Sequence, residues 1–232
     1  SLLVLENQRL IKQNLISDKL LENQLLNQEQ AQESVSLAAL SEKEKELSKS
    51  VEVKRRKRKK IQKEIERIIA EELRRVNASG TSKSFTSTPE ALALSESFTS
   101  NQGKLPWPVS KGLVISKFGK QNHPVLSGVV VENNGLEIAT EAHSACRAVF
   151  NGKVSSVLSM PNGVKVVMIR HGAYISVYAN LSDVYVQKGE EVKTKSEIGL
   201  VFTSKQEGST VLDFQLWKGS QKLNPQLWLM NK

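Results

Sequence analysis

The apolar positions of the chain follow two different periodicities, one before residue 77 and one after residue 103. Between Glu33 and Arg75 they recur at alternating spacings of three and four residues, which predicts an amphipathic helix. The residues on this heptad phase are Leu37, Leu40, Leu47, Val51, Ile61, Ile65 and Ile68. Neither Gly nor Pro occurs from Ser1 to Asn77. We therefore expect one continuous helix from about Leu2 to Val76, ~110 Å long at 1.5 Å per residue.

Upstream of this stretch the apolar surface is denser but does not keep the same phase, so a phase slip or a change of partner is expected. Its members are Leu10, Ile11, Leu15, Ile16, Leu20, Leu21, Leu25 and Leu26. A lone helix with such a stripe is not stable in water, which predicts a coiled coil. The partner helix could belong to a longer form of this chain, to a second copy or to another protein.

A region rich in Ser, Thr and Gly follows the helix and predicts a linker from about residue 77 to 87. Thr88-Pro89-Glu90 is then a typical helix start, with Thr as the N-cap and Pro in the first turn. The predicted short helix from Pro89 to about Ser100 could pack against the following domain or act as a movable plug. The expected organisation is a coiled-coil segment at 1–77, a linker with a short helix at 78–103 and a β domain at 104–232.

Strand patterns separated by turn residues predict that the C-terminal part is a β domain. Segments 147–150 and 154–158 are expected to form a hairpin through Asn151-Gly152, because Asn-Gly suits a type I′ turn. Segments 164–170 and 174–181 form the next expected pair. The predicted fold class is therefore α+β, with a long N-terminal helix followed by a mainly antiparallel sheet.

Charge and cysteine content add little to this picture. The formal net charge is +9, and the unbroken run from Lys54 to Lys60 contributes seven of those charges. A basic run confined to one helical stretch is typical of a solvated surface, and no nucleic-acid module accompanies it, so no nucleic-acid partner is expected. Cys146 is the only cysteine, which excludes an internal disulfide.

An ordered set of motifs from Lys104 to Leu229 resembles the LytM domains of the lysostaphin-like zinc endopeptidase family. The motifs include Leu105-Pro106-Trp107-Pro108-Val109, Phe118-Gly119, His123-Pro124, Arg170-His171-Gly172, Tyr178-Ala179-Asn180-Leu181 and Leu223-Asn224-Pro225. With the long helix in front, the chain is similar to murein hydrolase activators of the EnvC type, particularly those of the Bacteroidetes.

The resemblance implies five positions where an active enzyme would carry its zinc ligands and catalytic histidines. Here these positions hold Asn133, Glu137, Asn180, Val211 and Asp213. Zinc hydrolases need three good protein donors, normally with imidazole among them, to activate bound water. The replacements predict a degenerate domain with no catalytic residues, no metal and no cofactor.

For such domains the resemblance implies a binding function. The vacant substrate groove would bind a helix of a periplasmic N-acetylmuramoyl-L-alanine amidase, which then cleaves peptidoglycan during cell division. The candidate groove residues are Asn133, Asn134, Glu137, Tyr178, Asn180, Asp213 and Trp217, with Tyr178 and Trp217 expected to be partly exposed anchors.

The resemblance also implies how the groove would be regulated. The coiled coil would dock on the membrane complex FtsEX, and either the helix at 89–100 or the end of the long helix at 61–76 would cover the groove. The implied location is the periplasm. No signal peptide is visible, and because the sequence begins within a helical pattern, this absence does not count against a periplasmic location.

Three alternatives remain open on sequence grounds. Glu137 and Asp213 could hold zinc in a divergent peptidoglycan endopeptidase. The chain could instead tether peptidoglycan or division proteins without activating an enzyme. Finally, segment 186–198 superficially resembles a biotinyl or lipoyl carrier hairpin, although Lys193 and Lys195 lack the flanking Met usual there.

Overall fold

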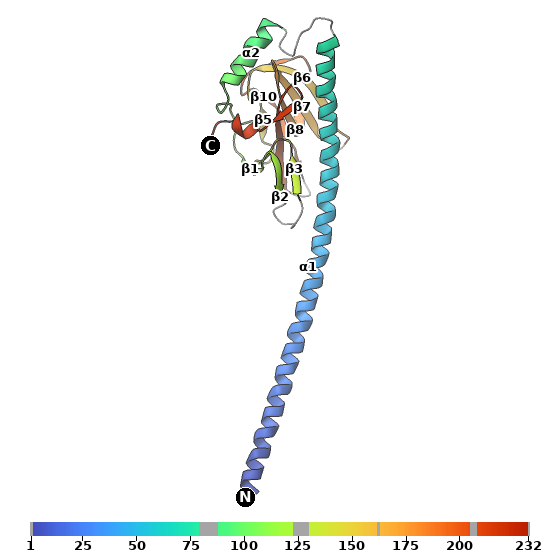
Figure 1. The fold of residues 1–232 in the computed structure, drawn as a ribbon, viewed down its shortest axis with the longest axis vertical. Helices are drawn as coiled ribbons and strands as arrows, with labels where there is room; N and C mark the ends of the chain where they lie inside the picture. Colours follow the sequence, from blue (N-terminus) through green and yellow to red (C-terminus); the bar gives the residue numbers. More distant parts are fainter. Residues whose placement is uncertain (1, 79–87, 123–129, 162, 205–207, 232) are drawn as a thin grey trace. The chain divides into compact units, whose positions relative to one another are not determined.

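The computed structural model describes residues 2–78, 88–122, 130–161, 163–204 and 208–231 (Figure 1). They divide into two compact units, Ser1–Lys59 and Lys60–Lys232. The predicted linker from residue 79 onward and His123 lie outside the described residues. The predicted domain boundaries at residues 77 and 103 stay predictions.

The predicted long helix is confirmed as α1 (Leu2–Ala78). In the first unit most of the described apolar side chains are exposed, and Leu40 keeps 68% of its surface accessible. Pairing of this part with another helix stays a prediction. Within the described part of the chain, no helix has an apolar stretch long enough to span a membrane.

Helix α2 (Pro89–Ser100) is confirmed with the predicted start. The side-chain oxygen of Thr88 accepts a hydrogen bond from the backbone N–H of Ala91 at 3.2 Å, and Pro89 occupies the first turn. This pairing satisfies one of the donors that a helix start leaves free. The helix buries Ser95 and Phe98 in the second unit.

The second unit is built on antiparallel strands, which confirms the predicted fold class. The strands and the final short helix are β1 (Leu113–Ser116), β2 (Gly119–Asn122), β3 (Val130–Asn133), β4 (Leu136–Ala139), β5 (Ala145–Arg147), β6 (Gly152–Ser159), β7 (Lys165–His171), β8 (Tyr174–Val184), β9 (Glu191–Val192), β10 (Glu197–Val201), β11 (Thr203–Ser204), β12 (Ser209–Lys218), β13 (Gln221–Leu223) and η1 (Pro225–Leu227). The main sheet has the order β1-β4-β12-β8-β7-β6-β9, and β2 pairs with β3 in a separate ribbon.

The hairpin predicted at Asn151-Gly152 is wrong. Strand β5 pairs with β10, whereas β6 pairs with β7 and β9, and neither Asn151 nor Gly152 has a positive φ. Asn151 instead accepts hydrogen bonds from the backbone and side chain of Thr194. A Cβ on Gly152 would lie 2.5 Å from the carbonyl oxygen of Arg170. The Asn-Gly pair therefore allows two strands to approach each other closely. The local sequence does not reveal this role.

Two apolar clusters lie on opposite faces of the main sheet. Adjacent residues of a strand point to opposite faces, and Tyr174 belongs to one cluster whereas Ile175 belongs to the other. The first cluster contains Phe98 of α2, and the second contains Ile65 of α1. Figure 1 shows α2 and the end of α1 on the two sides of the strands.

Candidate functional site

Strand β12 presents Asp213, Gln215 and Trp217 on one face of the main sheet, because alternate residues of a strand share a face. Their cross-strand partners are Ala179, Val177 and Ile175 in β8, with Glu137 of β4 also opposite Asp213. We call the surface formed by these seven residues the Trp217 face. It carries two carboxylates at one end and an aromatic ring with aliphatic side chains at the other.

Residues 61–73 of α1, called the cover segment below, pack on this face. Ile65, Ile68 and Ile69 are buried, and their spacing places them on one side of the helix. Their buried neighbours in the sheet are Val166, Met168, Ile175, Val177, Ala179 and Trp217. Removing such side chains from water contributes about 1.5–3 kcal/mol each before the entropy of ordering is subtracted. The cover segment is thus held mainly by three isoleucines, and Trp217 is left only 2% exposed.

A chain of hydrogen bonds runs beside these isoleucines and joins the helix to β12. The amide nitrogen of Gln215 donates to Oε1 of Gln62 at 3.1 Å and to both carboxylate oxygens of Asp213 at 3.4 Å. The amide oxygen of Gln215 accepts from the indole N–H of Trp217 at 3.2 Å. Gln62 also donates to Glu66, one helical turn later, at 3.0 Å. Gln215 therefore links the sheet's own polar groups to the cover segment.

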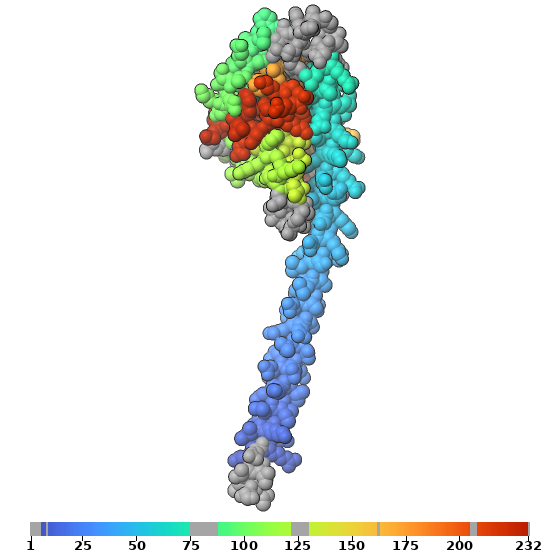
Figure 2. All heavy atoms as spheres, in the orientation of Figure 1, coloured from blue at the N-terminus to red at the C-terminus, as the bar shows by residue number. Residues whose placement is uncertain are grey.

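Lys222 continues this chain from β13, where it lies opposite Trp217. Its ammonium nitrogen lies 2.8 Å from Oε1 of Glu66 and 3.0 Å from Oδ1 of Asn134. The same nitrogen lies 5.3 Å from the centroid of the Trp217 ring, within cation–π range. The hydrogen bond from Lys222 lowers the pKa of Glu66, although partial burial acts in the opposite direction. We call the connected residues Gln62, Glu66, Asn134, Asp213, Gln215, Trp217 and Lys222 the polar seam. Figure 2 shows the C-terminal strands, in red, against the end of α1, in teal.

Four of the residues expected in the groove meet at this face. Asn134, Asp213 and Trp217 belong to the polar seam, and Glu137 lies opposite Asp213. The buried Asn133 has a local role instead. Its amide donates to the hydroxyl of Ser116 at 3.2 Å, and its oxygen accepts from the backbone N–H of Gly135 at 3.3 Å. A Cβ on Gly135 would lie 2.2 Å from the carbonyl oxygen of Phe214, so this turn needs glycine.

The other two expected residues do not join them. Asn180 has a φ of 68°, a left-handed conformation that Asn tolerates, and its amide donates to the carbonyl of Val211 at 2.6 Å. Tyr178 is fully buried, and its neighbours on the paired strands belong to the first apolar cluster rather than to the Trp217 face. Its hydroxyl accepts from the backbone N–H of Val149 at 2.9 Å. Tyr178 and Trp217 were both expected to be partly exposed, and that expectation is wrong.

The opposite face holds a buried histidine. Nδ1 of His171 lies 2.6 Å from the carbonyl oxygen of Asn151, and Nε2 lies 2.8 Å from the hydroxyl of Ser176. A carbonyl only accepts, so Nδ1 carries the proton in the neutral ring. Burial lowers the pKa of His171 to about 4. Its ring stacks on Phe98 with the centroids 5.0 Å apart, which makes it part of the core.

The donor set on the Trp217 face does not suit zinc. Across the ranges that the structure describes, no group of three His, Cys, Asp or Glu side chains is placed to hold a metal ion. Glu137 and Asp213 lie opposite each other, but Gln215 donates to Asp213 and Asn133 is engaged in its own turn. His171 lies on the other face. Two carboxylates without imidazole make a poor zinc site.

Several residues of the site were not predicted from sequence. Gln215 had a usable signal, because it lies between Asp213 and Trp217 on one strand face. No sequence signal pointed to Lys222 and Glu66, because they come into contact only when β13 and α1 are brought together by the fold. The end of the long helix had been one of two expected covers, and it is the one that lies on the Trp217 face.

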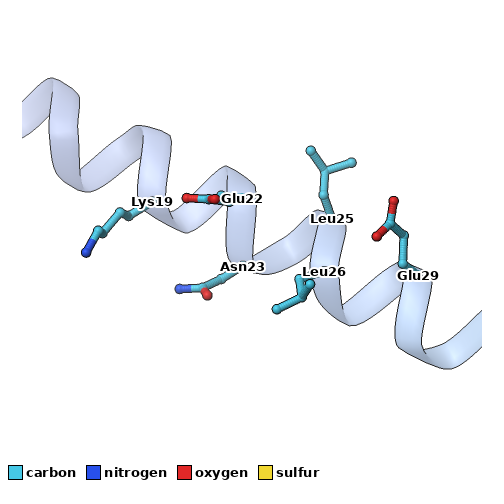
Figure 3. A pocket seen from close by; sticks show the side chains of 6 residues that line it. All are labelled: Lys19, Glu22, Asn23, Leu25, Leu26 and Glu29. Carbon is cyan, nitrogen blue, oxygen red and sulfur yellow. The ribbon is translucent and has the colours of Figure 1, made fainter.

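A separate hollow of about 490 Å³ lies on the first unit (Figure 3). Its lining residues are Lys19, Glu22, Asn23, Leu25, Leu26 and Glu29, all on helix α1. Among the residues that the structure describes, only helix α1 lines this hollow. It therefore carries no catalytic arrangement.

Known proteins resemble the β domain of this chain. Residues 131–225 match the sequence profile described as peptidase family M23. The chain is 27% identical over 129 residues to the murein hydrolase activator EnvC of Escherichia coli (strain K12), a match that covers 55% of this chain and 29% of the relative. It is 32% identical over 139 residues to protein NMB1333 of Neisseria meningitidis serogroup B, covering 60% of this chain and 22% of the relative.

A solved structure of a zinc-containing peptidase from Vibrio cholerae is 27% identical, with a TM-score of 0.47 over 56% of this chain and 41% of that chain. The present chain spans less than a third of the length of either curated relative. The segment that matches the family profile contains the sheet residues of the polar seam.

Proposed function

We propose that this chain, whose residues 131–225 match the sequence profile of peptidase family M23, activates periplasmic N-acetylmuramoyl-L-alanine amidases without cleaving murein itself. The similarity to a murein hydrolase activator supports this assignment. The family resemblance implies that Asn133, Glu137 and Asp213 stand at the zinc-donor positions, and these residue types support a non-catalytic role. Peptidoglycan would be close by as the substrate of the amidase, and no nucleic acid takes part.

One observation carries the proposal: the Trp217 face already binds an amphipathic helix, the cover segment. The face offers an apolar floor for three isoleucines and a polar seam beside it. A surface that holds one helix in this way suits another helix with the same spacing of apolar residues. We infer that an amidase helix binds here, with Trp217 as its main contact.

Regulation follows from competition for one surface. The amidase helix and the cover segment cannot occupy the Trp217 face together, so activation requires the cover to leave. Loosening the cover by about 2 kcal/mol would raise the population of the open state about 30-fold. The exposed apolar side chains of the first unit, such as Leu15 and Leu40, suit docking to a membrane complex of the FtsEX type. In this proposal that complex, at the periplasmic face of the membrane, moves the helix.

The test is murein hydrolysis by candidate cell-wall amidases, measured as release of soluble fragments from labelled murein. Each amidase is assayed alone and together with the chain. A separate reaction contains the chain alone with added zinc. Activity only when both proteins are present supports the activator. Lack of stimulation by the chain, for every amidase that it binds, would leave a tethering role.

The Glu137 and Asp213 pair motivates one competing function, a divergent zinc endopeptidase. Cleavage by the chain alone that requires zinc and stops on chelation would establish that enzyme and overturn the activator. Glu137→Gln and Asp213→Asn would then abolish the activity.

The role of the cover is tested in the same assay by substitution. Deletion up to residue 101 is unsuitable, because α2 contributes Phe98 to the core. Ile65→Ala should instead raise the amidase stimulation severalfold at limiting chain concentration. Val53→Ala, an equally simple truncation at an exposed position of α1, serves as the control and should leave stimulation unchanged.

A further inference from the structure

We propose that Lys222 determines which helices bind the Trp217 face, by requiring a carboxylate directly after the central apolar residue of the bound helix. This inference rests on the proposed function, because it describes the helix that the amidase would supply. In the cover segment the carboxylate is Glu66, which follows Ile65. The partner helix would repeat the pattern of the cover segment rather than present any apolar face.

The geometry gives the pattern its register. Gln62 follows Ile61, and Glu66 follows Ile65, so the two polar side chains lie one turn apart along the same edge of the helix. Gln62 meets Gln215, and Glu66 meets Lys222. A bound helix is thereby fixed both along its axis and in direction. Its amide must come one turn before its carboxylate.

Lys222 is held in place by the sheet itself. Asn134 accepts a hydrogen bond from its ammonium group, and the ring of Trp217 lies below it. Neither contact involves the cover segment, so the ammonium group stays in position when the cover leaves. A preorganised cation loses little side-chain entropy when a carboxylate arrives.

The opposite end of the face rejects the same carboxylate. Asp213 lies four residues along β12 from Trp217, about 13 Å away at the rise of a strand, and Glu137 of β4 lies opposite Asp213. A helix bound in reverse would bring its carboxylate towards these two groups, where like charges repel. The face is therefore selective through attraction at Lys222 and repulsion at Asp213 and Glu137.

Charge-swapped peptides test this selectivity directly. The probe is a synthetic helical peptide with the sequence of residues 58–76, compared with the same peptide carrying Glu66→Gln or Glu66→Lys. Binding is measured by fluorescence anisotropy to the full chain with Ile68→Ala, which loosens its own cover. We expect the Glu66→Gln peptide to bind about fivefold more weakly and the Glu66→Lys peptide more weakly still.

Substitution in the chain should reverse this order. Lys222→Glu in the same background is expected to favour the Glu66→Lys peptide over the Glu66 peptide, and Lys222→Gln to abolish the discrimination. Lys218→Glu is the matched control, since it makes the same charge change on β12 but its ammonium group lies over the Tyr174 ring. An unchanged preference in Lys222→Glu, or an equal change in Lys218→Glu, would overturn the proposal. Circular dichroism confirms that each variant is folded.

The peptide experiment contains no amidase, which separates the two proposals. A reversal of preference together with a failure to stimulate any amidase would disprove the activator function and leave the selectivity of the face intact. The reverse outcome is also distinguishable. If the chain stimulates an amidase, but substitution of Lys222 changes neither peptide binding nor that stimulation, the activator function stands and the proposed selectivity is disproved.

Discussion

Two helical segments pack on the same sheet of this protein, but they do so by different physical means. Helix α2 places Phe98 in an aromatic cluster, where its ring centroid lies 4.7 Å from that of Tyr174 and 5.3 Å from those of Phe150 and Trp228. Without Phe98 this cluster would lose its centre. The cover segment instead rests on three isoleucines and a polar seam.

The two segments differ in which groups of the sheet lose their partners when the segment is removed. Removal of α2 would take away Phe98, the stacking partner of His171 and Tyr174. It would also leave the backbone N–H of Ala173 without its acceptor, the hydroxyl of Ser95 at 2.8 Å. Removal of the cover segment leaves Trp217 bonded to Gln215 and Lys222 bonded to Asn134. One contact is part of the fold, whereas the other is suited to exchange.

The strongest test of this contrast is Phe98→Ala. It should lower the free energy of unfolding of the second unit by about 3–5 kcal/mol, because a buried aromatic side chain leaves a cavity. Urea denaturation followed by tryptophan fluorescence measures the loss. Leu92→Ala on the same helix, at a position that is 46% exposed, is the control. A similar small effect for both would show that α2 is not part of the core.

The pH dependence of stability offers a second test of the α2 side. The folded pKa of His171, about 4, lies below the usual value of about 6.5. Because the folded state favours the neutral ring, its contribution to the free energy of unfolding is fully present above about pH 6.5. This contribution falls by up to about 3 kcal/mol as the pH decreases towards 4. Denaturation at several pH values should show this loss. The variant His171→Gln should show a shallower dependence over the same interval, and an identical slope would contradict the assignment.

Ile65→Ala tests the cover segment. Because Ile65 is fully buried against the sheet, truncation should weaken the cover by about 2 kcal/mol and raise amide exchange in residues 61–73 about 30-fold. Hydrogen exchange read by mass spectrometry measures both regions at once. Amides of β7 and β8 should keep most of their protection. Equal acceleration in the helix and the strands would mean that the cover unfolds only with the domain.

Glu66→Gln should give the smallest effect. Both partners of its ion pair with Lys222 are partly exposed, so the pair contributes roughly 0.5–1 kcal/mol. Exchange of the cover segment should rise about two- to fivefold. Because the pKa of Glu66 is lowered in the folded state, its contribution is present above the unfolded pKa of about 4.3 and disappears as pH falls through the folded value. Glu64→Gln, which breaks an exposed pair with Arg67, should not open the cover.

Sequence reasoning reached the architecture because its signals are local. The absence of Gly and Pro fixed the expectation of α1, and Thr88-Pro89 marked the start of α2. It failed at Asn151-Gly152, where a preference for a tight turn was overridden by the close approach of Gly152 to the neighbouring strand. Turn chemistry predicts a bend but not which strands meet across it.

The candidate site was predictable only along single strands. Asp213 and Trp217 share a face because they are four residues apart, and Glu137 was placed near them by the resemblance to a zinc enzyme. Tyr178 was misplaced because its strand is buried on both sides, so alternation of apolar and polar residues gave no sign of which face it occupies. Glu66 and Lys222 are 156 positions apart, and nothing short of the fold pairs them.

The central claim is that a partner helix and the cover segment exchange on the Trp217 face. It is tested most directly by hydrogen exchange of the full chain with and without an amidase that binds it. Binding should remove protection from residues 61–73 while the amides around Trp217 and Lys222 stay protected. Unchanged protection of the cover segment in the saturated complex would show that the amidase binds elsewhere and would contradict the account.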